Sequence, residues 1–436
     1  MSAIEYKCPN CAAPLVYDAG SKLIKCDFCD STFKPEELGK IETTAIDHET
    51  ARIDDQYIEG EKAEEYWKTV NAKTAGYTCS SCGGAIIGTV DSAALFCPYC
   101  GNPAVIQSSL SGEFKPDYII PFTKTKEQAV AAYKDFCGKG KKVLPKAFQD
   151  DHAVEKVTGI YIPYHLMSCD ASAGCKYTSE ITEKWSDAMY DYEKINYFAN
   201  TRAGRMSFDR IPSDASSSID DDFMESIEPF NYSELRPFEM SYLSGFLADK
   251  YDLSVEQISS NLDSRVDMTI CSELRNTVEA AGYKNVVTKS SDVNIFNRRY
   301  SYALLPVWLL RTRYNNEFYY FAMNGQTGKV AARLPVDSKK VSGTAFGYAA
   351  LAFAICLAAF LLIGRSVGAF FAGILIGVLV GLITGLITKS KLYSLVRNVM
   401  RAGGASNYVS GSLKLSVRED QLTDSKTNRT LRKKED

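Results

Sequence analysis

Two long stretches near the C-terminus contain no charged residue. The first, from Val341 to Gly364, reads "VSGTAFGYAALAFAICLAAFLLIG", and the second, from Ser366 to Thr388, reads "SVGAFFAGILIGVLVGLITGLIT". Each stretch exceeds the roughly 20 apolar residues that a helix needs to cross a bilayer. A buried helix of a soluble domain is the alternative, but two such runs in succession favour the membrane. We therefore expect a two-helix transmembrane hairpin over residues 345–388.

The charges around these runs predict the orientation of the hairpin. The link between the runs, "GRS", is too short for anything except a tight helical turn, so both ends of the hairpin lie on one side of the membrane. Cytoplasmic flanks carry an excess of Lys and Arg. The turn holds only Arg365, whereas the flanks hold Lys339, Lys340, Lys389, Lys391, Arg397 and Arg401. We expect a two-pass protein of the cell membrane, with the N-terminus and a tail (389–436) in the cytoplasm.

Four glycines in the second run recur at intervals of four residues. This spacing places them on one helix face, where backbones can approach closely. The pattern predicts packing, either within the hairpin or between copies in a homo-oligomer. Neither run contains an acidic residue or a histidine that could form an ion or proton path. An anchor is therefore favoured over a transporter. The glycines are Gly373, Gly377, Gly381 and Gly385.

Eight of the thirteen cysteines form four Cys-x-x-Cys pairs near the N-terminus. In both halves of this region, fourteen residues separate the second cysteine of one pair from the first of the next. The segments "YKCPNCAAPLVYDAGSKLIKCDFC" and "YTCSSCGGAIIGTVDSAALFCPYC" align as a duplication, each with room for a short hairpin. The pairs are Cys8/Cys11 and Cys26/Cys29 in the first module, and Cys79/Cys82 and Cys97/Cys100 in the second.

Four thiolates from two such turns supply the tetrahedral sulfur shell that zinc prefers. The N-terminus has no apolar run typical of a signal peptide, so we expect reduced thiols and favour zinc over disulfides or an iron–sulfur cluster. We predict two structural zinc ions, one in each of two zinc ribbons (1–40 and 77–108). Because cysteine fills all four positions, neither ion has an open site for catalysis.

Zinc ribbons often bind nucleic acids, but the charges here argue against that role. The net charge of the chain is −3, and residues 77–107 contain one Asp and no Lys or Arg. Phosphate affinity comes mainly from Lys and Arg. Contact with cytoplasmic proteins therefore fits better. The alternative, a membrane-tethered regulatory protein that binds nucleic acid, is supported only by the basic segment "KTNRTLRKK" (426–434).

The remaining sequence predicts an acidic helical linker (41–76) and a cytoplasmic α+β domain (112–340). Helical periodicity marks 126–138 and 254–282, and strand signals mark 159–171 and 301–335. The fold class is therefore α+β and multidomain. His165 lies near Cys169 and Cys175, yet a core histidine beside buried cysteines is the simpler interpretation. We find no catalytic or phosphate-loop motif, since "GKGKK" and "GQTGK" lack the spacing, and we expect no enzyme and no catalytic residue.

Two long middle stretches, together with the ribbons and the hairpin, resemble a known family. The stretches are "DRIPSDASSSIDDDFMESIEPFNYSELRPFEMSYLSGFLADKYD" (209–252) and "LLPVWLLRTRYNNEFYYFAMNGQTGKVAARLPVD" (304–337). Over essentially its whole length the chain resembles bacterial membrane-anchored double zinc-ribbon proteins. These are often given a transcription-factor-type zinc-ribbon label or mislabelled as a replication-restart helicase.

The resemblance implies a membrane scaffold in envelope stress. Its implied partners are a flotillin-like (SPFH-domain) protein and a homologue of phage-shock protein A. The chain departs from the family's pattern in the first ribbon, where Gly usually follows the second Cys of a pair. Here Ala12 and Asp30 take those positions, whereas Gly83 and Gly101 keep the pattern. The departure concerns the backbone of the first ribbon and not its ligands.

Overall fold

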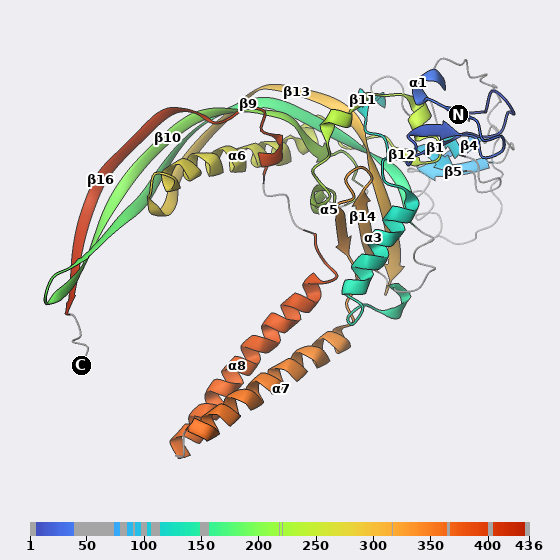
Figure 1. The fold of residues 1–436 in the computed structure, drawn as a ribbon. Helices are drawn as coiled ribbons and strands as arrows, with labels where there is room; N and C mark the ends of the chain where they lie inside the picture. The colour runs from blue at the N-terminus through green and yellow to red at the C-terminus, as the bar shows by residue number, and fades with distance from the viewer. Residues whose placement is uncertain are drawn as a thin grey trace, which may run out of the picture. The chain divides into compact units, whose positions relative to one another are not determined.

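A computed structural model describes most of the chain. The described residues are 6–38, 74–78, 85–89, 92–96, 103–105, 114–148, 157–217, 219, 221–315, 317–363, 367–399 and 404–431. The chain divides into two compact units. The first comprises residues 1–163, 216–252 and 303–401, and the second comprises residues 164–215, 253–302 and 402–436. Runs of strands are interrupted by helices, and most strand pairs are antiparallel, so the α+β expectation is confirmed (Figure 1).

The first unit begins with a small antiparallel sheet, in the order β1 (Val16–Asp18), β2 (Leu23–Lys25) and β3 (Thr32–Phe33), followed by the short helix α1 (Pro35–Leu38). The short hairpin expected between the first two cysteine pairs is therefore present. Leu15 and Ile24 are fully buried beneath it. Such a small module buries little apolar surface, so further contacts or a metal must supply its stability.

Four short strands fall in the region of the expected second ribbon. β4 (Thr74–Thr78) pairs with β5 (Ala85–Thr89), and β6 (Ser92–Phe96) pairs with β7 (Pro103–Val105), in both cases antiparallel. Most of the expected linker, residues 41–73, lies outside the described residues. The boundaries predicted for the linker and the second ribbon stay predictions.

The body of the first unit contains the helix expected near residue 126. α3 (Lys126–Lys139) begins at a capping box in which Thr125 and Gln128 satisfy each other's backbone N–H groups. The strands expected at 301–335 are also present and form an antiparallel meander. The later part of β13 (Lys284–Tyr314) pairs with β14 (Glu317–Asn324), which pairs with β15 (Val330–Arg333).

Short elements complete this unit. They are β8 (Tyr118–Ile119), η3 (Lys146–Phe148), α5 (Asp221–Ser226), η4 (Tyr232–Glu234), β11 (Arg236–Pro237), η5 (Met240–Leu243) and β12 (Leu247–Asp249).

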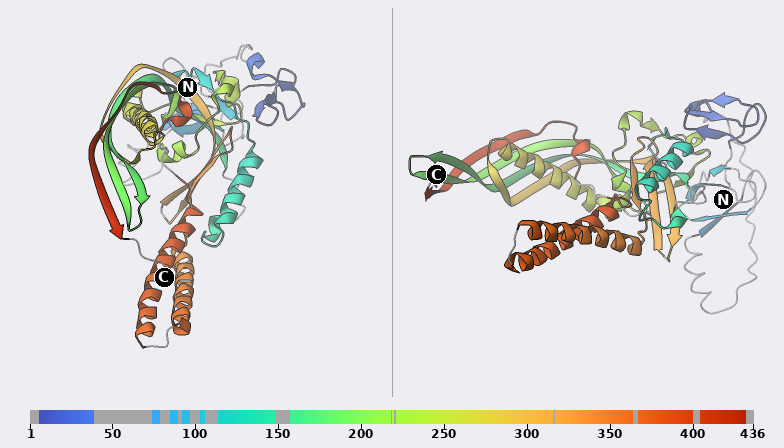
Figure 2. Two further views of the ribbon diagram at one scale, coloured as in Figure 1. Left: turned by 60° about the vertical axis from the view of Figure 1, so that its left-hand side comes forward. Right: turned by 60° about the horizontal axis from the view of Figure 1, so that its bottom comes forward.

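Two long apolar helices, α7 (Ser338–Ile363) and α8 (Val367–Ser394), lie side by side in both views of Figure 2. Their 26 and 28 residues correspond to roughly 40 Å each, enough to cross a bilayer. Only 6% of the most apolar window of α7 and 17% of that of α8 are buried. This exposure is unlike that of a core helix in a soluble domain, and both helices are long and apolar enough to span a membrane.

The four glycines of α8 face α7. A Cβ atom added at Gly373 would meet the Phe360 side chain at 2.8 Å, and one added at Gly381 would meet the backbone oxygen of Ala349 at 3.0 Å. Gly377 and Gly385 likewise lie against α7. Close packing within one hairpin therefore accounts for the spacing, and a homo-oligomer stays a proposal that these glycines do not require.

The second unit is built from long curved strands with one helix along them (Figure 1). β9 (Thr158–Ser186) pairs antiparallel with β10 (Tyr190–Asp214), and β10 pairs antiparallel with β16 (Lys414–Leu431). α6 (Val255–Glu279) begins at a capping box of Ser254 and Gln257. Its buried stripe, which includes an arginine and a threonine, consists of Ile258, Leu262, Arg265, Val266, Thr269, Ile270, Leu274 and Val278.

A polar network lies within this sheet. The fully buried guanidinium group of Arg202 on β10 forms an ion pair of 2.8 Å with Asp420 on β16, and Asn200 donates a hydrogen bond of 2.6 Å to the same carboxylate. Burial alone would raise the pKa of Asp420, but the hydrogen bonds from Arg202 and Asn200 lower it overall. Since a buried arginine is expensive without its partner, this network fixes β16 against β10.

Candidate metal centre

The first two cysteine pairs lie on two similar backbone turns. In the first turn the amide of Ala12 donates to the carbonyl of Cys8 (2.8 Å), and in the second the amide of Asp30 donates to the carbonyl of Cys26 (2.9 Å). Ala12 and Asp30 have φ angles of 62° and 57°. This left-handed region favours glycine, the residue that the family pattern places there. The ribbon therefore keeps its turn geometry with two strained residues.

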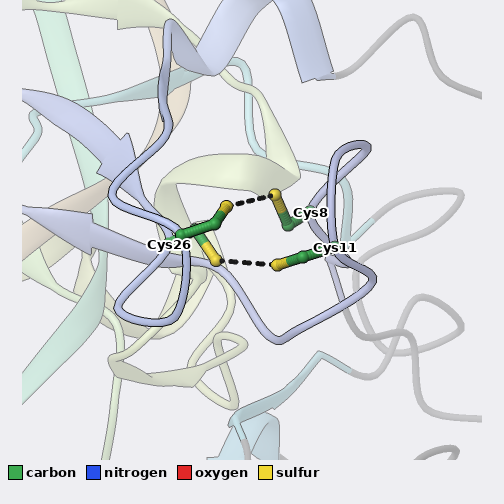
Figure 3. A group of neighbouring side chains, drawn as sticks. Cys8, Cys11 and Cys26 are labelled. Carbon is green, nitrogen blue, oxygen red and sulfur yellow. Dashed lines mark hydrogen bonds between the residues drawn. The ribbon is translucent and has the colours of Figure 1, made fainter.

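These turns bring the sulfur atoms of Cys8, Cys11, Cys26 and Cys29 together. All four Sγ atoms lie within 4.8 Å of one another. The Sγ atoms of Cys8 and Cys29 are 3.5 Å apart, and those of Cys11 and Cys26 are 3.4 Å apart. Figure 3 shows the labelled side chains pointing toward a common centre. The predicted ligand set of the first ribbon is therefore assembled.

The sulfur spacing suits a tetrahedral metal ion. Four ligands at the usual Zn–S distance of about 2.3 Å would have sulfur atoms about 3.8 Å apart. The observed distances of 3.4 and 3.5 Å lie just below this value, and the 4.8 Å limit lies above it. They are far longer than the roughly 2.05 Å of a disulfide bond. The cluster can hold a metal ion, and its all-sulfur donor set fits zinc.

Burial and hydrogen bonds differ among the four cysteines. Cys8 and Cys26 are buried, whereas Cys11 and Cys29 are exposed. Ser31 was not singled out in the sequence, although its hydroxyl lies 3.2 Å from the Cys29 sulfur. This contact, with the Ser31 backbone, lowers the pKa of Cys29 to about 6. The only sequence feature that could have predicted this contact is that Ser31 lies two residues after Cys29, a predicted ligand. A thiol that ionises readily favours metal binding, because the thiolate is the ligand.

The ribbon is attached to residues 234–246 of the first unit. The amide of Tyr17 donates to the carbonyl of Ser244 (3.0 Å), and the Ser244 hydroxyl donates to the carbonyl of Leu15. The hydroxyl of Tyr242 donates to Glu36 at 2.8 Å. These residues lie within one of the long stretches that carry the family resemblance. The cysteine cluster is therefore held on a structured support.

The other predicted ligands, Cys79, Cys82, Cys97 and Cys100, lie outside the described residues. The second zinc site therefore stays a prediction. The five remaining cysteines are not part of the first cluster. Cys137, Cys169 and Cys175 are buried, and Cys271 and Cys356 are half-buried.

The Cys/His alternative considered for the middle domain is not assembled. His165 is 6% exposed, and its Nε2 lies 3.2 Å from the carbonyl oxygen of Leu253. Burial lowers the pKa of this histidine. Cys169 is four residues further along β9, about 13 Å in an extended strand. The "GQTGK" segment (325–329) forms the turn between β14 and β15, where Asn324 accepts hydrogen bonds from the amides of Gln326 and Thr327.

Comparison with known proteins gives one similarity. Over 361 residues the chain is 29% identical to the uncharacterized protein YdjG of Bacillus subtilis (strain 168), a match that covers 83% of this chain and 98% of that protein. No family model and no solved structure matches the chain. Since the description of this relative states no activity, a function must be argued from the residues themselves.

Proposed function

We propose that the protein is a non-enzymatic, membrane-anchored zinc-ribbon scaffold that recruits cytoplasmic proteins to the membrane. The convergence of four thiols in the first ribbon carries this proposal. All four ligands come from the chain, which leaves a tetrahedral ion no open position for a substrate. The ion would therefore be structural zinc. The matching spacing of Cys79, Cys82, Cys97 and Cys100 supports a second such ion.

The anchor in this proposal is the α7–α8 hairpin. Its exposed apolar surface and the lysines and arginines on its outer flanks support a two-pass arrangement with both termini in the cytoplasm. A green fluorescent protein fused to either end should be fluorescent in the cytoplasm and should sediment with membranes. Activity of an alkaline phosphatase fused to either end would instead indicate that this end lies outside the cytoplasm.

The surface of the first ribbon favours a protein partner. Phe28, in the turn between Cys26 and Cys29, is 76% exposed. Exposed aromatic side chains are typical anchors of protein interfaces. The nearby charges are largely balanced: Lys25 lies 3.4 Å from Asp18, and Lys22 lies 3.8 Å from Glu234. Over residues 6–38, four lysines stand against five acidic residues, so the ribbon has no net positive charge to attract phosphates.

The proposed partners are a flotillin-like protein and a phage-shock protein A homologue, acting in envelope stress. The test co-expresses the tagged full chain with each candidate and measures its recovery from detergent-solubilised membranes. Phe28→Ala should reduce recovery at least tenfold while zinc content stays unchanged. Phe318→Ala, which truncates an exposed phenylalanine elsewhere, is the matched control. Equal recovery with the parent chain and with Phe28→Ala would show that the ribbon is not the docking surface. If neither candidate is recovered with the parent chain, the proposed partners are wrong.

The alternative function is membrane-tethered binding of nucleic acid. Two cations of its basic segment are engaged within the sheet, since Lys426 lies 5.6 Å from the ring of Tyr197 and Arg429 lies 5.3 Å from that of Tyr190. This arrangement favours the scaffold. Binding of RNA or DNA that weakens steeply with salt would support the alternative.

A further inference from the structure

A cavity in the second unit plays no part in the scaffold proposal. Its volume is about 560 Å³, within the range of sites for small organic ligands. Its walls come from β9, β10, β13, the segment before β16 and the first residue of β16. The lining residues are Asp170, Arg205, Met206, Ser207, Phe296, Ser410, Gly411, Ser412 and Lys414.

Two cations lie opposite each other in the lining of this cavity. Arg205 on β10 and Lys414 on β16 are directly opposite each other in the strand register. Like charges in this position repel each other and destabilise a sheet. Neither side chain has an ion-pair partner within the part of the chain that the structure describes. A pair of this kind is stabilised when an anion binds between the two charges.

The one carboxylate in the lining is already engaged. Asp170 accepts a hydrogen bond of 2.6 Å from the Ser207 hydroxyl at Oδ1 and one of 2.8 Å from the Asn297 amide at Oδ2. Both hydrogen bonds, chiefly the one from Ser207, lower the pKa of Asp170. The carboxyl group therefore stays ionised at neutral pH. One negative charge against two positive charges leaves the lining with a formal net charge of +1.

The segment before β16 forms a fixed but open wall. The amide of Ser410 donates to the carbonyl of Ser207 (2.9 Å), and Val409 forms a β-bridge with Phe208. A Cβ atom added at Gly411 would meet nothing within 4 Å. The serine hydroxyls on either side of this glycine therefore stand at the edge of open space, on backbone that is anchored to β10.

We infer that this cavity binds a phosphoryl group, with Arg205 and Lys414 as its cationic contacts and Ser410 and Ser412 as hydroxyl donors. An arginine can hold two phosphate oxygens at once, and a lysine adds a compact charge. Phe296 offers an apolar wall to an attached organic group. The phosphoryl group belongs either to a soluble phosphate ester or to the headgroup of an anionic lipid.

The test uses the full chain in nanodiscs of phosphatidylcholine. Equilibrium dialysis with radiolabelled inorganic phosphate, and separately with glycerol 3-phosphate, measures soluble ligands. Hydrogen exchange of residues 405–415, compared between discs with and without phosphatidylglycerol, measures the lipid. Protection that appears only with phosphatidylglycerol assigns the lipid source, whereas saturable binding in pure phosphatidylcholine assigns the soluble one.

Variants connect either signal to the cavity. Arg205→Gln and Lys414→Gln should each weaken binding about tenfold or more, because each removes a charged hydrogen bond. Asp170→Asn should tighten it several-fold, since it removes the negative charge. Lys176→Gln, which removes an exposed charge on β9 outside the cavity, is the control and should bind like the parent chain.

Three results would overturn the inference. The first is no saturable binding and no protection under any of these conditions. The second is unchanged binding in both Arg205→Gln and Lys414→Gln when circular dichroism shows them folded. The third is equal binding of acetate, which would indicate a general anion site. Cys26→Ser should leave phosphate binding intact, so failure of the zinc proposal would not be mistaken for failure of this one.

Discussion

Cysteines approach one another in two regions of the molecule, with different consequences. In the first ribbon, four sulfur atoms lie within 4.8 Å on turns in which two of the cysteines are exposed. In the second unit, Cys175 on β9 and Cys271 on α6 have sulfur atoms 3.6 Å apart between a strand and the helix that packs on it. The first group can hold a metal ion, and the second lies between packed elements.

The surroundings account for the difference. Hydroxyl and backbone donors of Ser31 lower the pKa of Cys29 to about 6, whereas burial, with the neighbouring Cys175, raises that of Cys271 to about 12. Burial also raises the pKa values of Cys137 and Cys169 to about 11. Proximity of thiols therefore does not define their chemistry. Hydrogen-bond donors such as those of Ser31 favour the thiolate that binds a metal, and burial without such donors disfavours it.

The largest expected effect separates the two groups by metal content. Cys26→Ser should lower the zinc content by about one ion per chain and unfold residues 6–38, because structural zinc contributes on the order of 10 kcal/mol to small modules. Cys271→Ser should retain all the zinc. Zinc released into a chromophoric chelator measures content, and limited proteolysis reports on the ribbon. Loss of zinc from Cys271→Ser as well would abolish the distinction.

A smaller effect concerns thiol reactivity. After zinc is removed at pH 8, the ribbon cysteines lose their metal and become accessible, so a short pulse of iodoacetamide should label Cys29 well before the half-buried Cys271. With a pKa of about 12, only about one in 10⁴ of the Cys271 side chains is a thiolate at that pH. Its reactivity should rise as the pH approaches its pKa, and it should become equal to that of the others in denaturant. Peptide mass spectrometry would reveal labelling of Cys271 at the rate of Cys29, the result that contradicts this prediction.

The smallest effect concerns the strained turn of the ribbon. Ala12→Gly should relieve the left-handed conformation and stabilise the metal-bound ribbon by about 1 kcal/mol, which is about a fivefold gain in zinc affinity. Ala13→Gly is the matched control, because Ala13 is not among the residues with positive φ. Competition with a chromophoric chelator measures both variants. Equal affinities of Ala12→Gly and Ala13→Gly would show that the turn stores no strain.

Sequence reasoning succeeded where side-chain pattern and structure coincide. The uncharged runs match α7 and α8 to within a few residues, and the periodic segment from Ser254 became α6. The spacing of the first two cysteine pairs predicted a cluster whose four sulfur atoms do converge. In each case the sequence pattern reports directly on the environment of the side chains, which is apolar, amphipathic or metal-binding.

The long strands of the second unit were predicted only in part. The strand signal ended near residue 171, yet β9 continues to Ser186, and neither β10 nor β16 was predicted. The inward positions of β10 include Asn200 and Arg202, which hide the alternation that marks a strand. β16 is exposed along almost its whole length. Its conformation comes from backbone pairing with β10 and from the Asp420 ion pair, and neither leaves a local pattern.

The position of β16 in the chain also fixes the order in which the molecule can be completed. β10 pairs with β9, which precedes it in the chain, and with β16, which follows both apolar helices. During synthesis, the second edge of β10 therefore waits unpaired while about 200 further residues are made. Open strand edges are prone to join other chains. A nascent chain whose synthesis stops within α7 or α8 would therefore leave this edge of β10 exposed, and the sheet is completed only after both apolar helices have been made.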